Sequence, residues 1–253
     1  MLNTPAMINL RNIPRRLYQL ILDGIFPQNC IYCDGDRKQG GDYLCHICRE
    51  EIDFILDAMC NRCGEPAEIS YDLPDEFECS RCRKQPQQFD RARSLGKYDS
   101  ILRQLIHHFK YQRQPGAMSE ITPLLQQYFS KMPLDLDGYY VSPVPLHFKK
   151  MKERGFDQAF LIAQQVAKEL HLPMANGLLR RIKETEPQAK KNQVERGKNI
   201  KGAFVVNHED WVKGKNILIV DDVFTTGATA NEAAKMLKKA KAGQVHVFTL
   251  ARV

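Results

Sequence analysis

Two adjacent carboxylates followed by small hydroxyl residues are the group in this chain best suited to chemistry. Asp221 and Asp222 follow the apolar run 217–220, and the segment 225–229 reads Thr-Thr-Gly-Ala-Thr. Threonine hydroxyls and free backbone N–H groups at a helix start favour an anion. Carboxylates cannot bind that anion and instead suit sugar hydroxyls or a divalent metal. The combination predicts a ligand that is a sugar carrying a phosphate.

These residues need a strand before them and a helix after them. Residues 217–220 are all apolar, which is typical of a strand buried on both faces of a parallel sheet. We expect the two acids where that strand ends, because open α/β sheets bind ligands at the carboxyl ends of their strands. As adjacent and unpaired groups, they should repel each other without a ligand. The following helix shows an apolar face. That face contains Ala230, Ala233, Ala234 and Leu237.

An ordinary helix start is the alternative explanation. Thr229 and Glu232 have the spacing of a capping box. Capping alone does not explain two acids followed by three threonines and a glycine, so we favour the ligand site.

The stretch 217–229 also closely resembles the ribose-phosphate signature of type I phosphoribosyltransferases. In that family the two acids bind the ribose hydroxyls of phosphoribosyl pyrophosphate (PRPP), and the following loop wraps its 5-phosphate. The resemblance implies that Asp221 and Asp222 hold the ribose. It assigns the 5-phosphate to Thr225, Thr226, Gly227, Ala228 and Thr229.

The eight cysteines form four Cys-x-x-Cys pairs between residues 30 and 82. Disulfide bonding would require secretion, and no export signal is evident. Such pairs place two thiolates on one tight turn, which suits tetrahedral zinc, so four pairs predict two structural sites. The simplest grouping is Cys30, Cys33, Cys45 and Cys48 in one site and Cys60, Cys63, Cys79 and Cys82 in the other. Spacing leaves an interleaved grouping open.

Charge is distributed unevenly along the chain. Residues 26–90 contain 14 acidic and 7 basic residues, a balance of −7, and because the whole chain carries +7 the remainder carries +14. A polyanion should therefore prefer the part of the chain outside the cysteine-rich segment. No apolar run approaches the roughly 20 residues of a membrane span.

Periodicity predicts further elements. Asp99 is an expected N-cap, and Asp157 is the expected start of another helix. The expected helices are an amphipathic one at 14–23, a short one around 52–56, one following residue 99, and those at 118–129 and 157–170. The expected strands are 94–98, 139–144, 177–182 and 245–250.

Basic residues near two helix ends are further candidates for phosphate binding. Lys110 ends the helix after Asp99, where a cation either meets a phosphate or simply complements the helix dipole. Arg154 and Gly155 follow a basic segment, 147–153, and precede a helix. They are either part of a solvated loop or a diphosphate grip that combines guanidinium charge with backbone donors.

Taken together, these segments resemble the ComF family. The resemblance rests on the cysteine pairs, the helix end 105–111, Pro143-Val144-Pro145, the run Arg-Gly-Phe-Asp-Gln-Ala at 154–159 and the PRPP signature. Members are phosphoribosyltransferase-like proteins with an N-terminal double zinc ribbon, first known from natural DNA uptake. The resemblance also implies that the polar segment 185–200 is a loop that closes over the reacting centre.

We therefore expect an α/β protein with a parallel-sheet, type I phosphoribosyltransferase (Rossmann-like) domain. The expected organisation is an N-terminal helix in 1–25, a double zinc ribbon in 26–90 and the phosphoribosyltransferase-like domain in 91–253.

Two functions fit this organisation. The first is a PRPP-binding, Mg²⁺-dependent phosphoribosyltransferase in which Asp221, Asp222 and Arg154 serve catalysis; its acceptor is not specified, because no residue stands out as a general base or a nucleobase reader. The second is a non-catalytic protein that uses the PRPP fold as sensor or scaffold and binds single-stranded DNA. Its basic segments offer Tyr111, His147, Phe148 and Phe156 for base stacking. Both imply a cytoplasmic protein, with DNA-uptake or recombination proteins as candidate partners.

Overall fold

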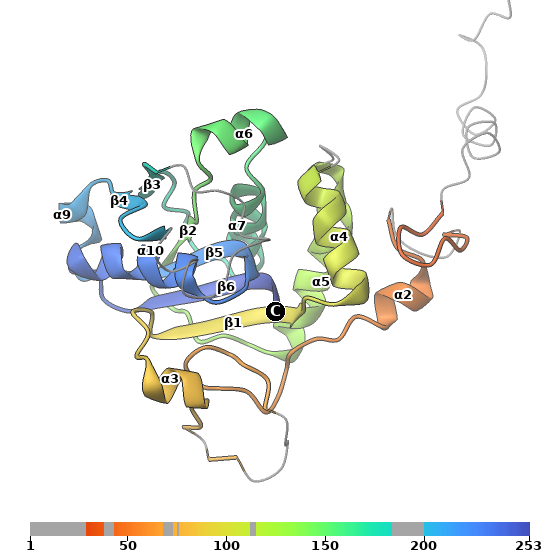
Figure 1. The fold of residues 1–253 in the computed structure, drawn as a ribbon, viewed down its shortest axis with the longest axis horizontal. Helices are drawn as coiled ribbons and strands as arrows, with labels where there is room; N and C mark the ends of the chain where they lie inside the picture. Colours follow the sequence, from red (N-terminus) through yellow and green to blue (C-terminus); the bar gives the residue numbers. More distant parts are fainter. Residues whose placement is uncertain (1–28, 38–42, 68–72, 75, 112–114, 184–199) are drawn as a thin grey trace, which may run out of the picture.

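A four-stranded parallel sheet forms the centre of the molecule (Figure 1). The computed structural model describes residues 29–37, 43–67, 73–74, 76–111, 115–183 and 200–253. In the order β1-β6-β5-β2, the strands are β1 (Arg91–Lys97), β6 (Val245–Arg252), β5 (Asn216–Phe224) and β2 (Tyr139–Pro143). The sheet confirms the predicted α/β class. The predicted N-terminal helix lies outside the described residues.

Helices cover both faces of this sheet. One buried cluster joins Leu218 and Val220 of β5 to α4, α5 and α7, and the other joins Ile217 and Ile219 to α10. The alternation confirms that 217–220 is buried on both faces. These helices are α4 (Ser100–Tyr111), α5 (Met118–Lys131), α7 (Gln158–Glu169) and α10 (Ala228–Lys239), with a 3-10 turn η2 (Pro115–Ala117) before α5.

Strand β5 continues beyond the predicted end at Val220. Its parallel pairing to β6 includes Asp221 with Thr249 and Phe224 with Arg252. The expectation that the acids follow the strand was therefore wrong: they lie within its last part. Continued hydrogen bonding to the long partner strand holds them in extended backbone, which fixes the direction of both carboxylates.

A short strand pair and a short helix lie outside the main sheet. Strands β3 (Leu179–Arg181) and β4 (Phe204–Val206) form an antiparallel pair, and α9 (Glu209–Val212) follows. The predicted loop 185–200 falls between β3 and β4, and all of it except Ile200 lies outside the described residues.

The cysteine-rich segment differs from the prediction in its local structure. Its helices are α2 (His46–Glu50) and α3 (Ser80–Lys84). The short helix expected around 52–56 is absent, because these residues run antiparallel to the open edge of β1. Ile55 N–H donates to Leu95 O, and Lys97 N–H donates to Asp53 O. Gly96 permits this approach, since a Cβ there would lie 2.8 Å from Asp53 O. The segment thus covers an edge that would otherwise expose unpaired backbone groups.

The basic segment expected as a loop before Gly155 is a short helix, α6 (Phe148–Arg154). None of its residues is buried, and Figure 1 shows it standing away from the sheet. Gly155 ends it in the left-handed conformation, with φ of 82°. Because no face of α6 is buried, its sequence lacks the apolar periodicity from which the other helices were predicted.

The two cysteine groups join different cores. Cys30, Cys45 and Cys48 pack with α4 and α5, whereas Cys60, Cys63 and Cys82 pack with α10. Figure 1 shows α2 beside α4 and α5, and α3 beside β1. The cysteine-rich segment is therefore built into the fold at two separate places. In the part of the chain that the structure describes, no helix has the length and apolarity to cross a bilayer.

A fully buried acid attaches the first cysteine group to α5. The Glu120 side chain is 0% exposed and forms an ion pair at 2.6 Å with Arg49 of α2. Its other oxygen accepts the N–H groups of Tyr43 and Leu44, at 3.1 and 3.3 Å. A buried carboxylate remains tolerable only with such partners, so this contact fixes how the first cysteine group sits on α5.

We predict that Glu120→Gln destabilises the protein by about 1–3 kcal/mol, because the partly exposed Arg49 loses its charged partner and two N–H groups lose a carboxylate acceptor. Urea denaturation would measure the change. Glu50→Gln is the matched control: Glu50 lies on the exposed surface of α2, and this change should cost less than about 0.5 kcal/mol. Equal stability of the two variants would contradict the assigned role of Glu120.

Candidate functional site

The acid pair on β5 is reached by Lys110 at the end of α4. Lys110 Nζ lies 2.9 Å from Asp222 Oδ1, with side-chain exposures of 15% and 14%. Asp222 N–H donates to Asp221 Oδ1 at 2.8 Å. The expectation of two unpaired acids was therefore wrong. It failed because the last turn of α4 brings a cation to the strand from more than 100 residues earlier in the chain.

The charges in this site shift the proton affinity of two groups. Burial and the neighbouring Asp222 carboxylate raise the pKa of Asp221 to about 7, although the charges of Lys110 and Arg181 oppose this. Burial alone would lower the pKa of Lys110, but the Asp222 carboxylate raises it above its ordinary value. Lys110 is thus charged at neutral pH, while Asp221 holds a proton more readily than an ordinary carboxyl group does. A cation binding at Asp221 would displace a proton.

Arg154 and Gly155 lie at the junction of α6 and α7, near the acid pair. Arg154 Nη1 donates to Gln158 Oε1 at 2.9 Å. Its positive charge acts to lower the pKa of Lys110, so the two cations share one electrostatic environment. The structure therefore brings together Arg154, Lys110 and the acids, which are far apart in sequence.

Residues 225–229, which the sequence predicts to wrap a phosphate and which are called the phosphate loop below, join β5 to α10. Gly227 is at the N-cap position with φ of 76°, a left-handed conformation that glycine adopts without strain. Ala228 N–H donates to Thr226 Oγ1 at 3.4 Å, which leaves the hydroxyl proton of Thr226 able to meet an anion. The other two threonines of the loop are half-buried. Hydroxyls and helix N–H groups converge here, as an anion site requires.

The capping-box alternative does not describe the start of α10. The helix begins at Ala228, so Thr229 is not its cap. Glu232 Oε1 instead accepts the N–H of Gly202 at 2.7 Å. The acid at this position thus attaches the segment leading into β4 to α10.

Three residues near the site were missed by sequence reasoning as functional candidates. Arg181 of β3 is close enough for its charge to lower the pKa of Asp221. Asp157 caps α7 by accepting the N–H of Phe160 at 3.1 Å, and burial together with the Asp222 charge raises its pKa. Gln158, 0% exposed, positions Arg154. The adjacent arginines 180 and 181 at a predicted strand were the available signal, whereas Asp157 and Gln158 resembled ordinary helix-start residues.

The eight cysteines form two four-thiol groups. The groups are Cys30, Cys33, Cys45 and Cys48, and Cys60, Cys63, Cys79 and Cys82, and in each the sulfur atoms lie within 4.8 Å of one another. The simplest predicted grouping is therefore the one found, and interleaving is excluded. Four thiolates fill a tetrahedral shell and leave no open position, as in structural zinc sites. In the second group, the Cys60 sulfur also accepts N–H groups from Cys63 and Cys79.

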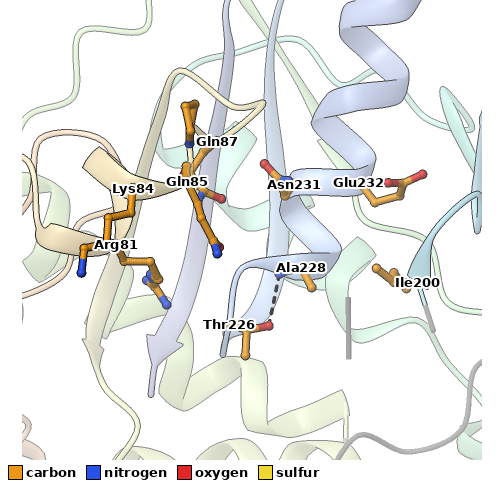
Figure 2. Close-up of a pocket in the computed structure, with 10 residues that line it drawn as sticks. Arg81, Lys84, Gln85, Gln87, Ile200, Thr226, Ala228, Asn231 and Glu232 are labelled. Atoms are coloured by element: carbon orange, nitrogen blue, oxygen red, sulfur yellow. Dashed lines mark hydrogen bonds between the residues drawn. The ribbon is translucent and has the colours of Figure 1, made fainter. Parts of the chain in front are cut away.

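A cavity of about 620 Å³ lies on the side of the phosphate loop that faces the second cysteine group. Figure 2 shows Arg81 and Lys84 of α3 on one side and Asn231 and Glu232 of α10 on the other. Thr226 and Ala228 line it, but neither acid of β5 does. The cysteine-rich segment therefore lies directly across from the phosphate loop.

The two acids should affect stability in opposite directions. Asp222→Asn leaves Lys110 without its charged partner and should lower the free energy of unfolding by about 1–3 kcal/mol at pH 7. Because the folded pKa of Asp221 is raised from 3.8 to about 7, its contribution to stability is present at low pH and is lost as pH rises through that range. Asp221→Asn should therefore stabilise the protein at pH 8 and reduce the loss of stability between pH 5 and pH 8.

Urea denaturation of the wild type and both variants at the two pH values measures these effects. A wild-type pH dependence that Asp221→Asn leaves unchanged would contradict the assignment of the raised pKa. An Asp222→Asn variant as stable as the wild type would show that the ion pair with Lys110 contributes no stability.

The matches to protein families agree with this geometry. Residues 21–83 match the double zinc ribbon domain, and residues 157–253 match the phosphoribosyl transferase domain. The two four-cysteine groups fit the double zinc ribbon. Among solved structures, an adenine phosphoribosyl transferase from Trypanosoma brucei aligns with a TM-score of 0.39 and 13% identity over 64% of this chain and 71% of that chain.

Relatives match over nearly the whole chain. Competence protein F of Haemophilus influenzae is 30% identical over 90% of this chain and 98% of its own length. Competence protein ComFC of Bacillus subtilis is 28% identical over 90% of this chain and 97% of its own length. DNA utilization protein YhgH of Escherichia coli is 31% identical over 89% of this chain and 97% of its own length. With a double zinc ribbon, a phosphoribosyltransferase domain and these relatives, the chain belongs to the ComF family.

Proposed function

We propose that this protein binds PRPP together with Mg²⁺ at the end of β5. The observation that carries the proposal is the acid pair in the last part of β5, which leads into the glycine turn at the start of α10, with Lys110 2.9 Å from Asp222. The carboxylates suit ribose hydroxyls, and the phosphate loop suits the 5-phosphate. The two groups lie on consecutive parts of one strand–turn–helix unit, as one ribose phosphate would require.

Arg154 and Gly155 are assigned to the pyrophosphate group of PRPP. A guanidinium is a strong partner for phosphate oxygens, and Gln158 already orients it through the 2.9 Å hydrogen bond. When the ligand binds Asp222, it displaces Lys110 from its ion pair, and Lys110 then provides a second cation for the pyrophosphate. Bound Mg²⁺ would supply charge neutralisation at the pyrophosphate. The raised pKa of Asp221 suits such a site, because a cation nearby favours its carboxylate form.

These residues would also support transfer of the phosphoribosyl group. In that reaction the bond from the anomeric carbon to pyrophosphate breaks and a nucleophile takes its place. Asp221 and Asp222 would stabilise positive charge developing on the ribose, while Arg154 stabilises the departing pyrophosphate. The names of the relatives point to DNA uptake and utilisation as the setting, so we propose an acceptor connected with DNA handling. DNA-uptake or recombination proteins are the partners expected there.

The proposal also includes the cytoplasm as the site of action. Eight cysteines in two zinc-binding groups need to remain reduced, and the cytosol keeps thiols in that state.

Calorimetric titration of PRPP with Mg²⁺ tests the ligand assignment. Asp221→Asn should weaken binding by about 1–3 kcal/mol, the range for losing a charged hydrogen bond. Gly227→Val should weaken it further, because a Cβ there would lie 2.5 Å from Phe224 Cζ and the left-handed turn disfavours a branched residue. Asp210→Asn on exposed α9 is the matched control and should bind as the wild type does. Unchanged affinity in both site variants would remove the ribose-phosphate assignment.

Binding of single-stranded DNA is a second candidate, and the exposure of Phe148 favours it. This side chain is 67% exposed on α6, among lysines 149, 150 and 152. An exposed aromatic among cations is the arrangement on which nucleic-acid bases stack. Phe156, another aromatic expected for stacking, packs against Phe109 with ring centroids 5.4 Å apart. Of these two rings, Phe148 is therefore the one placed to stack on a base.

Phe148→Ala should weaken binding of an oligothymidylate by about 1–3 kcal/mol, the value of one base stacked on an aromatic ring. Fluorescence anisotropy at several salt concentrations would measure it. Lys149→Gln combined with Lys150→Gln should flatten the salt dependence by about 0.7 log unit for each phosphate that is no longer bound. Ile47→Ala, which removes an equally exposed apolar side chain from the acidic cysteine-rich segment, is the control. An oligonucleotide affinity that none of these changes alters would exclude α6 as the DNA-binding element.

A further inference from the structure

The phosphate loop rests on the tip of the Phe224 ring. A Cβ placed on Gly227 would lie 2.5 Å from Phe224 Cζ and 3.0 and 3.3 Å from its two Cε atoms. The ring therefore points end-on at the turn, and it leaves room for no side chain at that position. Phe224 is the last residue of β5 and is 3% exposed, so the ring cannot retreat without opening the core. The position of the ring therefore determines how closely the phosphate loop can approach the core.

Phe224 is held in turn by two groups. The Arg252 guanidinium lies over its face, 4.9 Å from the ring centroid, and Phe89 contacts it in a T-shaped arrangement at 5.9 Å. Phe89 belongs to the segment that leads from the cysteine groups into β1, and it is 0% exposed. Val253 N–H also donates to Phe224 O at 3.0 Å. Contacts from Arg252 and Phe89 therefore hold the ring, and the bond from Val253 holds the backbone that carries it.

The second cysteine group orients Arg252. This arginine is 3% exposed and donates to Cys63 O and to the carboxylate of Glu65. Glu65 Oε2 also accepts from Arg81 at 3.0 Å, and Arg81 lies 3.7 Å from Cys63 Sγ. A buried guanidinium requires such partners, because ion pairs and hydrogen bonds offset the free energy that its removal from water costs. Arg252 can thus stay over Phe224 only while Glu65 and the Cys63 turn keep their places.

We propose that Glu65, Arg252 and Phe224 are positioning residues that hold the phosphate loop in its binding shape, so that the second zinc ribbon supports recognition of the 5-phosphate. The path runs from the Cys63 turn through Glu65 and Arg252 to the Phe224 ring and then to Gly227. Every step is a direct contact between buried or half-buried groups. The inference rests on the proposed function, which it deepens: the ribbon shapes the phosphate end of the site and leaves the pyrophosphate end, at Arg154, unaffected.

Two ligands that occupy different ends of the site test this. Glu65→Gln should lower the affinity for ribose 5-phosphate by about three- to tenfold, the usual range for changes along a coupling network. Affinity for inorganic pyrophosphate with Mg²⁺ should stay within about twofold, because the path does not reach Arg154. The matched control is Glu78→Gln, which removes the charge of another acid of the same ribbon, paired with Arg62 at 3.2 Å. It should leave both affinities unchanged.

Substitutions at Phe224 distinguish positioning from mere stability. Phe224→Tyr adds a hydroxyl at Cζ, the atom nearest to Gly227, and should displace the loop and weaken ribose 5-phosphate binding more than Glu65→Gln does. Zinc content of two per chain in every variant shows that the ribbon remains intact. If Phe224→Tyr fails to fold, the ribose 5-phosphate affinities of Glu65→Gln and Glu78→Gln are sufficient to test the positioning role.

Hydrogen exchange of the amides of residues 225–229 gives a readout that needs no ligand. It should be faster in Glu65→Gln than in the wild type and unchanged in Glu78→Gln. If the wild type binds ribose 5-phosphate and the two Glu→Gln variants bind it equally, the positioning role is wrong and the proposed function stands. If the wild type does not bind ribose 5-phosphate, the proposed function fails, and loop exchange decides whether the ribbon supports the loop. Equal exchange in both variants would overturn that support.

Discussion

Charges removed from water must be paired, and in this protein the pairs join segments that are distant in sequence. Glu120 of α5 holds Arg49 of the first cysteine group, and Lys110 of α4 holds Asp222 of β5. Arg252 of β6 is held by Glu65 of the second group. Removing one member of such a pair leaves a buried charge without compensation. The relative positions of the cysteine groups, the helices and the sheet therefore depend on one another.

This dependence explains why the zinc ribbons are not a separate appendage. A short cysteine-rich segment has little apolar surface with which to fold alone, and a four-stranded sheet leaves β1 as an open edge. Residues 53–55 cover the open edge by pairing with β1. The cysteines of the two groups gain apolar contacts because they belong to the two buried clusters of the sheet. Metal ligation at these places would stabilise contacts of the sheet itself as well as the turns that carry the thiols.

The sequence predicted what local pattern determines. The apolar run 217–220, the Cys-x-x-Cys pairs and the helix after Asp157 all carry their structure in short-range spacing, and the strand, the thiol groups and α7 follow it. Local pattern does not predict contacts between residues that are far apart in the sequence. The partner of Asp222 is an example, because nothing near Lys110 marks that cation as the one that meets β5. The expected helix at 52–56 failed for the same reason: a sheet edge elsewhere in the chain overrode the local preference.

The candidate site shows the same division between local and distant determinants. Residues 221–229 form one continuous unit, and the prediction of a ribose-phosphate site there rests on their order alone. What tunes that unit comes from elsewhere: Lys110 and Arg181 act on the charge of the acids, and Arg252 lies over the ring of Phe224, on which the phosphate loop rests. A strand–turn–helix unit of this kind can keep its motif and still change its affinity, because the groups that set its charge and shape lie on α4, β3 and β6. We therefore expect the ligand affinity of this unit to depend on these distant elements as well as on the motif.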